Sequence, residues 1–520
     1  MKRGVNVSRL LSVFVGTLWV LGFITLSKSS VGTRIGFLES WTASSPGELQ
    51  TWLGVILLLT PGTTLLTWGL APWLILWLKA CLQGLKARSR LQHILLISSA
   101  GITALSTYGL LGSWMSRGYP LLDEIASVRF GGRILATGNV RLKMPECWPA
   151  LSHLYLHARD GFYTSFDWLG AQLAWALSEL THTGSWIFAA MAAATLVTVM
   201  LTLRKLLDVR WSVIAGLAFV CSPMAFMLSL SSHAHIGSRL FVALSILTYV
   251  YAQTTSLRRW WITLGVCLGM GIMFRPAEVT LLLAPLVIAT FIRLPNDPQT
   301  RHALGWTFAG LVVPLVVIAW HNHIVTGHFW LFARFAHNDF LEASNLRSQR
   351  PWAIFMDASL LWHRFGTNLI YNLQQLFIWA FGPIGVVFFA WGVSATRLSR
   401  LLSWGIALLL LLALAHDDSG LHVFGPMHYS DAIVPIIIVI LYGIRRAHHN
   451  LQTLLPASSS HLILSFCIGM LAGGLGLSLR QVKALHYQGA IHDSVYGMVW
   501  DKKFNHSVVI ALPYETLWKQ

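Results

Sequence analysis

Residues 91–126 read LQHILLISSAGITALSTYGLLGSWMSRGYPLLDEIA. An apolar run from Leu91 to Leu111 is followed, after a short connection, by two adjacent carboxylates, Asp123 and Glu124. A helix of about 20 apolar residues is long enough to cross a bilayer. Acidic residues in a connecting loop are usually only solvated. An acidic pair at the mouth of a membrane span, however, also suits chemistry at the membrane surface.

The composition indicates that most of the chain is membrane-embedded. Its 520 residues are 55% hydrophobic and 11% charged, whereas soluble domains carry about 25% charged residues. We therefore expect an all-α polytopic membrane protein with about 13 transmembrane helices, several of them short for a bilayer. The predicted spans lie at 10–28, 51–78, 91–113, 185–203, 212–229, 238–253, 261–274, 277–292, 304–320, 372–392, 401–415, 432–444 and 461–478.

The distribution of charge predicts the orientation of these spans. The net charge is +17, and most of it falls on alternate short connections that contain few acids. Basic connections face the cytoplasm in membrane proteins. The N-terminus is therefore predicted to be cytoplasmic, and the C-terminus and the Asp123–Glu124 loop extracytoplasmic. This orientation explains the basic charge, so no nucleic-acid partner is expected.

The spans and loops divide the chain into three predicted parts. Residues 1–90 form an appended N-terminal transmembrane element, and residues 91–478 form the main transmembrane domain. This domain has two large outer loops, 114–184 and 321–371. Residues 479–520 are expected to be a short extracytoplasmic tail.

The outer segments carry two further local patterns. The loop after Glu124 contains amphipathic stretches, including one that begins near Phe166, and such stretches lie along a membrane surface rather than cross it. The tail alternates at residues 507–512, which is typical of a short strand.

Arg275, Pro276 and Glu278 interrupt two apolar runs that would otherwise merge. Charged groups this close to hydrocarbon must pair or bind a ligand. The spacing allows an Arg275–Glu278 salt bridge at i,i+3, and the arginine also suits an anionic ligand. Pro276 is placed to begin the second helix, because proline at the first helical position loses no hydrogen bond.

Histidines gather near the predicted outer ends of the spans, among them His233, which is close to Arg239, and His428. A further group, at residues 416–420, combines His416 with two aspartates. Histidines beside carboxylates permit metal or phosphate binding. The chain has no HExxH or comparable ligand spacing, so no cofactor is assigned and a divalent cation is left open.

Over about residues 91–445 the sequence resembles the GT-C superfamily of integral-membrane glycosyltransferases, in particular bacterial members related to protein O-mannosyltransferases and aminoarabinose transferases. The segments that carry this resemblance are Asp123-Glu124, residues 132–138, Ser232-His233, Arg275-Pro276, Asn322 with Thr326-Gly327, and Gly425-Pro426 with His428-Tyr429. It implies a GT-C-like bundle with amphipathic outer helices, and location in a bacterial inner (plasma) membrane.

The resemblance also implies transfer of a sugar from a polyprenyl-phosphate donor to a glycan, lipid or protein acceptor on the extracytoplasmic side, with inversion. Asp123 is the expected base, and Glu124 is expected to orient the acceptor or to bear a cation. The expected donor-phosphate ligands are Arg275, His428, His233 and Arg239. In many relatives a basic residue follows the late Gly-Pro pair, where this chain has Met427, and His428 is the candidate to supply that donor.

Three other functions are weighed against this one. A transporter or flippase of lipid-linked saccharides also has many spans and broken helices, but the ionisable groups here lie at one end of the spans. A polysaccharide polymerase or ligase would use a pyrophosphate-linked oligosaccharide outside the membrane. A non-catalytic assembly partner is the third alternative.

Overall fold

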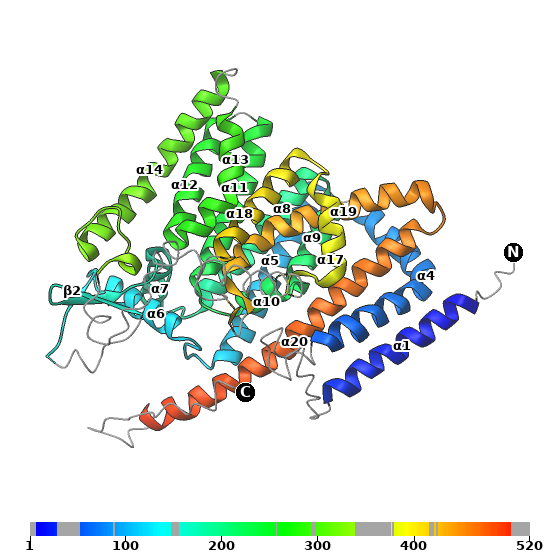
Figure 1. Cartoon of the computed structure of the whole chain (residues 1–520), viewed down its shortest axis with the longest axis horizontal. Coiled ribbons are helices and arrows are strands. Elements are labelled where there is room, and N and C mark those ends of the chain that lie inside the picture. The colour runs from blue at the N-terminus through cyan, green and yellow to red at the C-terminus, as the bar shows by residue number, and fades with distance from the viewer. Residues whose placement is uncertain are drawn as a thin grey trace, which may run out of the picture.

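The structure is a computed structural model, and it describes residues 7–28, 52–86, 89–146, 155–255, 257–292, 298–337, 376, 379–414, 421–422 and 425–500. These residues are almost entirely helical (Figure 1). The prediction of an all-α fold is confirmed. The described strands are all short, and the longest of them have four residues.

The helices have the following bounds. In the first half of the chain they are α1 (Val7–Lys28), α4 (Thr60–Lys86), α5 (Arg90–Ser116), α6 (Asp123–Ala136), α7 (Leu169–Thr181), α8 (Trp186–Leu206), α9 (Val209–Cys221), α10 (Pro223–Ser229) and α11 (Ala234–Thr255). The second half contains α12 (Arg258–Phe274), α13 (Pro276–Phe291), α14 (Pro298–Thr326), α17 (Gly382–Val393), α18 (Arg397–Leu414), α19 (Ile433–Leu454) and α20 (Ser459–Trp500).

The helices confirm that the chain is an integral membrane protein. In the described residues, eight helices are long and apolar enough to cross a membrane, or nine if the bent pair α9 and α10 counts as one span. That pair bends by 68° where Ser222 precedes Pro223, since a residue before proline is disfavoured in the helical region. α13 and α17 are apolar but shorter, so the total of about 13 spans stays a prediction.

The helices form a central bundle with a flanking layer. α19 lies at the centre: in the most apolar 18-residue stretch of the span that contains it, 94% of the residues are buried inside the protein, compared with 6% for the span of α1. Figure 1 shows α1, α4 and α20 side by side along one flank, and α14 on the opposite flank next to α12. The division of residues 1–90 from the rest stays a prediction, because α4 packs directly on α20.

The segment after the last span differs from the expected polar tail. α20 continues without a break to Trp500, so residues 479–500 are helical. Part of this extension is held against α5, where His486 stacks on Trp114 with ring centroids 3.7 Å apart, and His486 Nδ1 lies 3.0 Å from the Trp114 carbonyl oxygen. Contacts between distant residues, such as this one, cannot be predicted from hydropathy along the sequence. The strand predicted at 507–512 lies outside the described residues.

Two amphipathic helices outside the bundle, α6 and α7, confirm the predicted outer-loop helices. Their axes approach closely, because a Cβ on Gly132 would lie only 2.4 Å from the Cβ of Trp175. A small antiparallel sheet in the order β1 (Leu142–Lys143), β3 (Phe162–Ser165), β2 (Leu156–Arg159) packs beside α6. The sheet was not predicted, although Asp160-Gly161, both with positive φ, is a strong hairpin signal.

Candidate functional site

The acidic pair begins α6, and its two side chains lie in different environments. Asp123 and Glu124 occupy the first turn of the helix, where negative charge is favoured by the helix dipole. Successive residues on a helix point about 100° apart because 3.6 residues make one turn. Asp123 is exposed, whereas Glu124 is half-buried. The pair therefore offers one carboxylate to the outside and one to the interior.

Glu124 faces a group of ionisable side chains from distant parts of the chain. Burial raises the pKa of Glu124, but the positive charges of Arg334, His233 and Arg275 together with a hydrogen bond to Asp167 lower it below its usual range. A carboxylate among cations stays ionised. Glu124 is thus an anion at neutral pH.

Asp167 is a member of this group that the sequence analysis missed. It lies between β3 and α7 and is buried, and the Trp168 N–H donates to its Oδ1 at 2.8 Å. Arg334 Nη1 lies 3.9 Å from the same oxygen. Burial and the neighbouring charge of Glu124 raise the pKa of Asp167 to about 7. An acid flanked by Phe166 and Trp168 at the start of an amphipathic stretch was the available signal.

Arg275 occupies the break between α12 and α13. Its backbone is extended, with φ −151° and ψ 90°, and Pro276 begins α13 as predicted. The guanidinium is buried and donates from Nε to Glu278 Oε1 at 2.9 Å, with a second bond from Nη2. The predicted i,i+3 salt bridge is confirmed. The same Nη2 lies 3.0 Å from His428 Nδ1.

The imidazoles continue the cluster away from Arg275. The His428 and His235 ring centroids are 6.1 Å apart, and those of His235 and His233 are 6.4 Å apart. His233 and His235 are buried. The basic groups of this cluster thus come from three segments that are distant in sequence: the start of α11, the α12–α13 break and the segment before α19.

Arg239 is a predicted phosphate ligand that lies deeper in the bundle than the cluster around Arg275. It is completely buried and donates to the Ala225 carbonyl oxygen at 3.2 Å and to Ser229 Oγ at 2.8 Å. Its guanidinium also lies over the Phe219 ring, 5.3 Å from the centroid. These contacts tie α10 to α11, and a role in binding phosphate stays a prediction.

Asp431, which the sequence analysis also missed, lies in the segment before α19 and contacts α11. It is fully buried, and Ser238 Oγ donates to its Oδ1 at 2.8 Å. A single acid at the start of an isoleucine-rich span was the only signal in the sequence.

Metal binding finds no support in the part of the chain that the structure describes. Within those residues, no group of three or more histidine, cysteine, aspartate or glutamate side chains could hold a metal ion. The predicted cluster at 416–420 lies outside them. A divalent cation therefore stays an open question for this chain.

The fold and the cluster define an integral membrane protein with carboxylates and basic groups gathered at one end of its helices. Residues 166–321 match the model of the family described as dolichyl-phosphate-mannose-protein mannosyltransferase. The matched segment includes Asp167, His233 and Arg275. The predicted resemblance to membrane glycosyltransferases of this kind is confirmed. A comparison with curated proteins finds no match.

Solved structures that are similar to this chain include the following two. The first is ArnT from Cupriavidus metallidurans bound to undecaprenyl phosphate, with 10% identity, a TM-score of 0.49, and coverage of 81% of this chain and 82% of that chain. The second is the Archaeoglobus fulgidus oligosaccharyltransferase in complex with Zn and sulfate, with 12% identity, a TM-score of 0.41, and coverage of 72% and 53%. Both TM-scores are too low for these similarities to support a function.

Proposed function

We propose that this chain transfers a sugar from a polyprenyl-phosphate donor to an acceptor on the extracytoplasmic side of the membrane, with inversion. The observation that carries the proposal is the meeting of Glu124 and Asp167 with Arg275, Arg334 and His233 at one end of apolar helices. A donor of this kind has a hydrocarbon tail for the bilayer and an anionic phosphate for the basic groups.

In the proposed reaction the acceptor hydroxyl or amine attacks the anomeric carbon while the bond from that carbon to the phosphate oxygen breaks. The acceptor's proton passes to a carboxylate, and polyprenyl phosphate leaves with the bonding electrons. A general base must lie within hydrogen-bond reach of the proton that it takes. Asp123 is the proposed base because it is exposed and can be reached by an acceptor from outside.

Glu124 and Asp167 are proposed to hold the acceptor and the cations in place. Glu124 is ionised among Arg334, His233 and Arg275, so its charge favours keeping these cations together. The carboxylate of Glu124 is also suited to bear a bound cation.

The departing phosphate needs positive charge where its negative charge develops. Arg275 is the leading candidate, because a planar guanidinium matches phosphate oxygens in a bidentate manner. Its hydrogen bond to His428 Nδ1 places a second donor beside it, which compensates for Met427 in the late motif. His233 is the third proposed contact, since it already influences the charge of Glu124.

The proposal is tested with the full chain in proteoliposomes that contain radiolabelled undecaprenyl-phosphate monosaccharides and a membrane extract as acceptor. We expect the label to move to an acceptor with loss of the lipid phosphate. Movement of intact donor across the bilayer without cleavage would instead identify a flippase. Transfer of a preassembled oligosaccharide, shown by the mass of the transferred unit, would identify a polymerase or ligase.

A further inference from the structure

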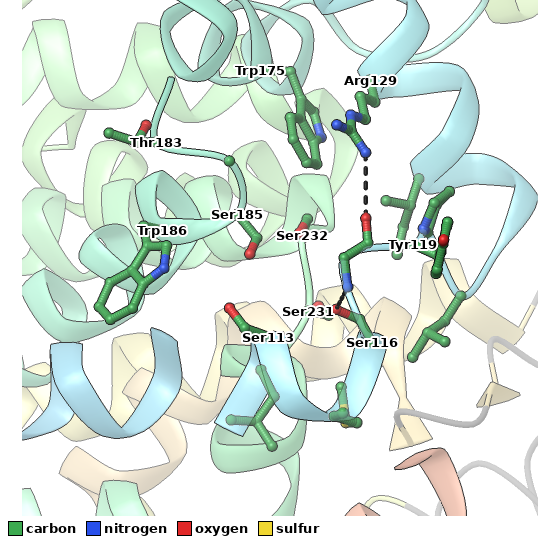
Figure 2. A pocket seen from close by; sticks show the side chains of 17 residues that line it. Ser113, Ser116, Tyr119, Arg129, Trp175, Thr183, Ser185, Trp186, Ser231 and Ser232 are labelled. Atoms are coloured by element: carbon green, nitrogen blue, oxygen red, sulfur yellow. Dashed lines mark hydrogen bonds between the residues drawn. The ribbon is translucent and has the colours of Figure 1, made fainter. Parts of the chain in front are cut away.

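A pocket lined largely by hydroxyl groups lies beside the ionisable cluster. Its volume is about 280 Å³, and it forms where the end of α5, the start of α6, the α7–α8 connection and the residues before α11 meet (Figure 2). Small-molecule sites commonly measure about 300–1,000 Å³. The pocket therefore has room for one ring-sized ligand.

Hydroxyl groups dominate the polar lining of this pocket. They belong to Ser113, Ser116, Tyr119, Thr183, Ser185, Ser231 and Ser232. Figure 2 shows the hydroxyls of Ser113, Ser185 and Ser232 directed toward the same space. Within the described residues, these three make no side-chain hydrogen bond to the protein. Each is therefore free to act as both donor and acceptor toward a ligand.

Aromatic side chains supply the flat walls of the pocket. Trp175 and Trp186 line it from α7 and from the first residue of α8. The indole Nε1 of Trp175 is buried and has no hydrogen-bond partner among the described residues. Apolar walls with a few placed hydrogen-bonding groups are typical of sites for small organic ligands. A sugar ring, with apolar faces and a polar edge, has the matching surface.

The one fixed charge in the described lining of the pocket is engaged by other groups of the protein. Arg129 is the one ionisable lining residue of fixed charge among the described residues, and its Nε lies 3.3 Å from Glu179 Oε1. Its guanidinium lies over the Trp175 ring at 5.1 Å and donates to the Gly118 carbonyl oxygen at 3.5 Å. Arg133 shares the same Glu179 oxygen at 3.2 Å, so one carboxylate serves two guanidiniums, and Nε and Nη1 of Arg129 are both occupied. A neutral polyhydroxylated ring needs no free cation.

The pocket shares two chain segments with the candidate reaction centre. Leu121 and Ile125 line it and flank Asp123 and Glu124 in the sequence. Ser232 lines it as well and directly precedes His233, whose charge acts on Glu124. A ligand in the pocket would thus lie next to the acidic pair and close to His233.

We propose that this pocket binds a neutral pyranose ring of the acceptor, so that the acceptor is a glycan. This inference rests on the proposed glycosyl transfer and specifies its second substrate. The donor's own sugar is a less suitable occupant, because it is bonded directly to a phosphate that needs the cations around Arg275.

Binding is tested without turnover, by saturation-transfer NMR on the full chain in nanodiscs with the methyl glycosides of glucose, mannose and galactose. We expect saturation transfer from at least one of them. The Ser113→Leu/Ser185→Leu variant, which fills the pocket, should bind the glycoside about tenfold more weakly. Ser99→Leu is the matched control, because Ser99 is an exposed residue of the same helix, and it should bind like the wild type.

A second variant, Ser185→Ala, removes a hydroxyl without adding volume and should weaken the saturation-transfer signal. It provides the test if the Ser113→Leu/Ser185→Leu variant fails to fold. Absence of binding in the wild type, or binding that both variants retain, would overturn the proposal. Tighter binding of glucose 1-phosphate than of methyl glucoside would overturn the assignment of a neutral ring.

Kinetics separate this inference from the proposed function. Filling the pocket should raise KM for the acceptor and leave KM for the lipid donor unchanged. A rise in donor KM alone would assign the pocket to the donor sugar and overturn the acceptor assignment. If glycosides bind but no sugar is transferred, the proposed glycosyltransferase function is refuted and the pocket remains a sugar-binding site. If transfer is unchanged in the filled variant, the assignment of the pocket to the acceptor is refuted and the glycosyltransferase function remains.

Discussion

Arg275 Nη2 lies 3.0 Å from His428 Nδ1, although the two residues are 153 positions apart in the sequence. The contact joins the α12–α13 break to the segment that precedes α19. Arg275 also bonds to Glu278, three residues later. One buried guanidinium thus connects a local ion pair with a long-range contact, and its replacement tests both.

Arg275→Ala should abolish use of the lipid donor and also destabilise the protein, because it leaves Glu278 buried without its partner. Breaking a buried ion pair in this way costs about 3–5 kcal/mol. Arg275→Gln/Glu278→Gln removes both charges and should recover most of the thermal stability without recovering transfer. Arg275→Lys keeps the charge but loses the planar fork, and its donor kcat/KM should be intermediate.

Those Arg275 measurements are made on detergent-purified protein by thermal unfolding and on proteoliposomes by donor and acceptor kinetics. Equal losses in donor and acceptor use across the series would indicate that Arg275 acts only as a structural partner of Glu278.

Asp123→Asn should reduce transfer by at least about a hundredfold, which is within the range that positioned proton transfer supplies. Because Asp123 is exposed, the variant should lose only the interaction of its charge with the helix dipole, about 0.3–1 kcal/mol, and its melting temperature should stay close to that of the wild type. Asp160→Asn, an exposed acid in the β2–β3 turn, is the control and should transfer normally. Normal turnover by Asp123→Asn would remove Asp123 from the mechanism, and Glu124→Gln would then be the next variant to measure.

The contribution of Asp167 to the stability of the protein should fall as the pH rises toward neutrality. The pKa of Asp167 is raised from 3.8 to about 7 in the folded chain, so the folded state binds more protons than the unfolded state between these values. The excess stability is present at low pH and is lost as the pH rises through about 7.

Melting temperatures measured from pH 5 to pH 8 check this expectation. The melting temperature of Asp167→Asn should rise relative to that of the wild type as the pH increases over this interval, whereas Asp160→Asn should keep the wild-type slope. Identical slopes in Asp167→Asn and the wild type would show that the Asp167 carboxyl does not titrate there.

Gly310→Ala should destabilise the contact between α14 and α12. A Cβ on Gly310 would lie 2.1 Å from the Ile262 carbonyl oxygen, so the two helices would have to separate. Overpacking of this kind costs about 1–3 kcal/mol. Gly305→Ala in the same helix meets no atom within 4 Å and should be neutral or slightly stabilising, since alanine favours helix over glycine. Thermal unfolding of the pair provides the measurement, and equal melting temperatures would contradict the close approach of the two helices at Gly310.

Local properties of the sequence determined the membrane spans, one ion pair and the amphipathic helices of this protein. Hydropathy, a sum over neighbouring residues, located the spans, and the i,i+3 spacing with Pro276 predicted the Arg275–Glu278 pair at a helix start. Amphipathic periodicity predicted α6 and α7. All of these depend on residues within a few turns of one another, so no knowledge of the fold was needed.

Only the tertiary structure decided which groups meet. The rotation of α6 places Glu124 rather than Asp123 toward the cations, and helix packing brings Asp167, Arg334 and His428 to the same region. The helical continuation of α20 beyond its apolar run also depends on packing, because its His486 is held by Trp114 of α5. Contacts between distant segments depend on how helices rotate and cross, and periodicity within one helix contains no information about its neighbours.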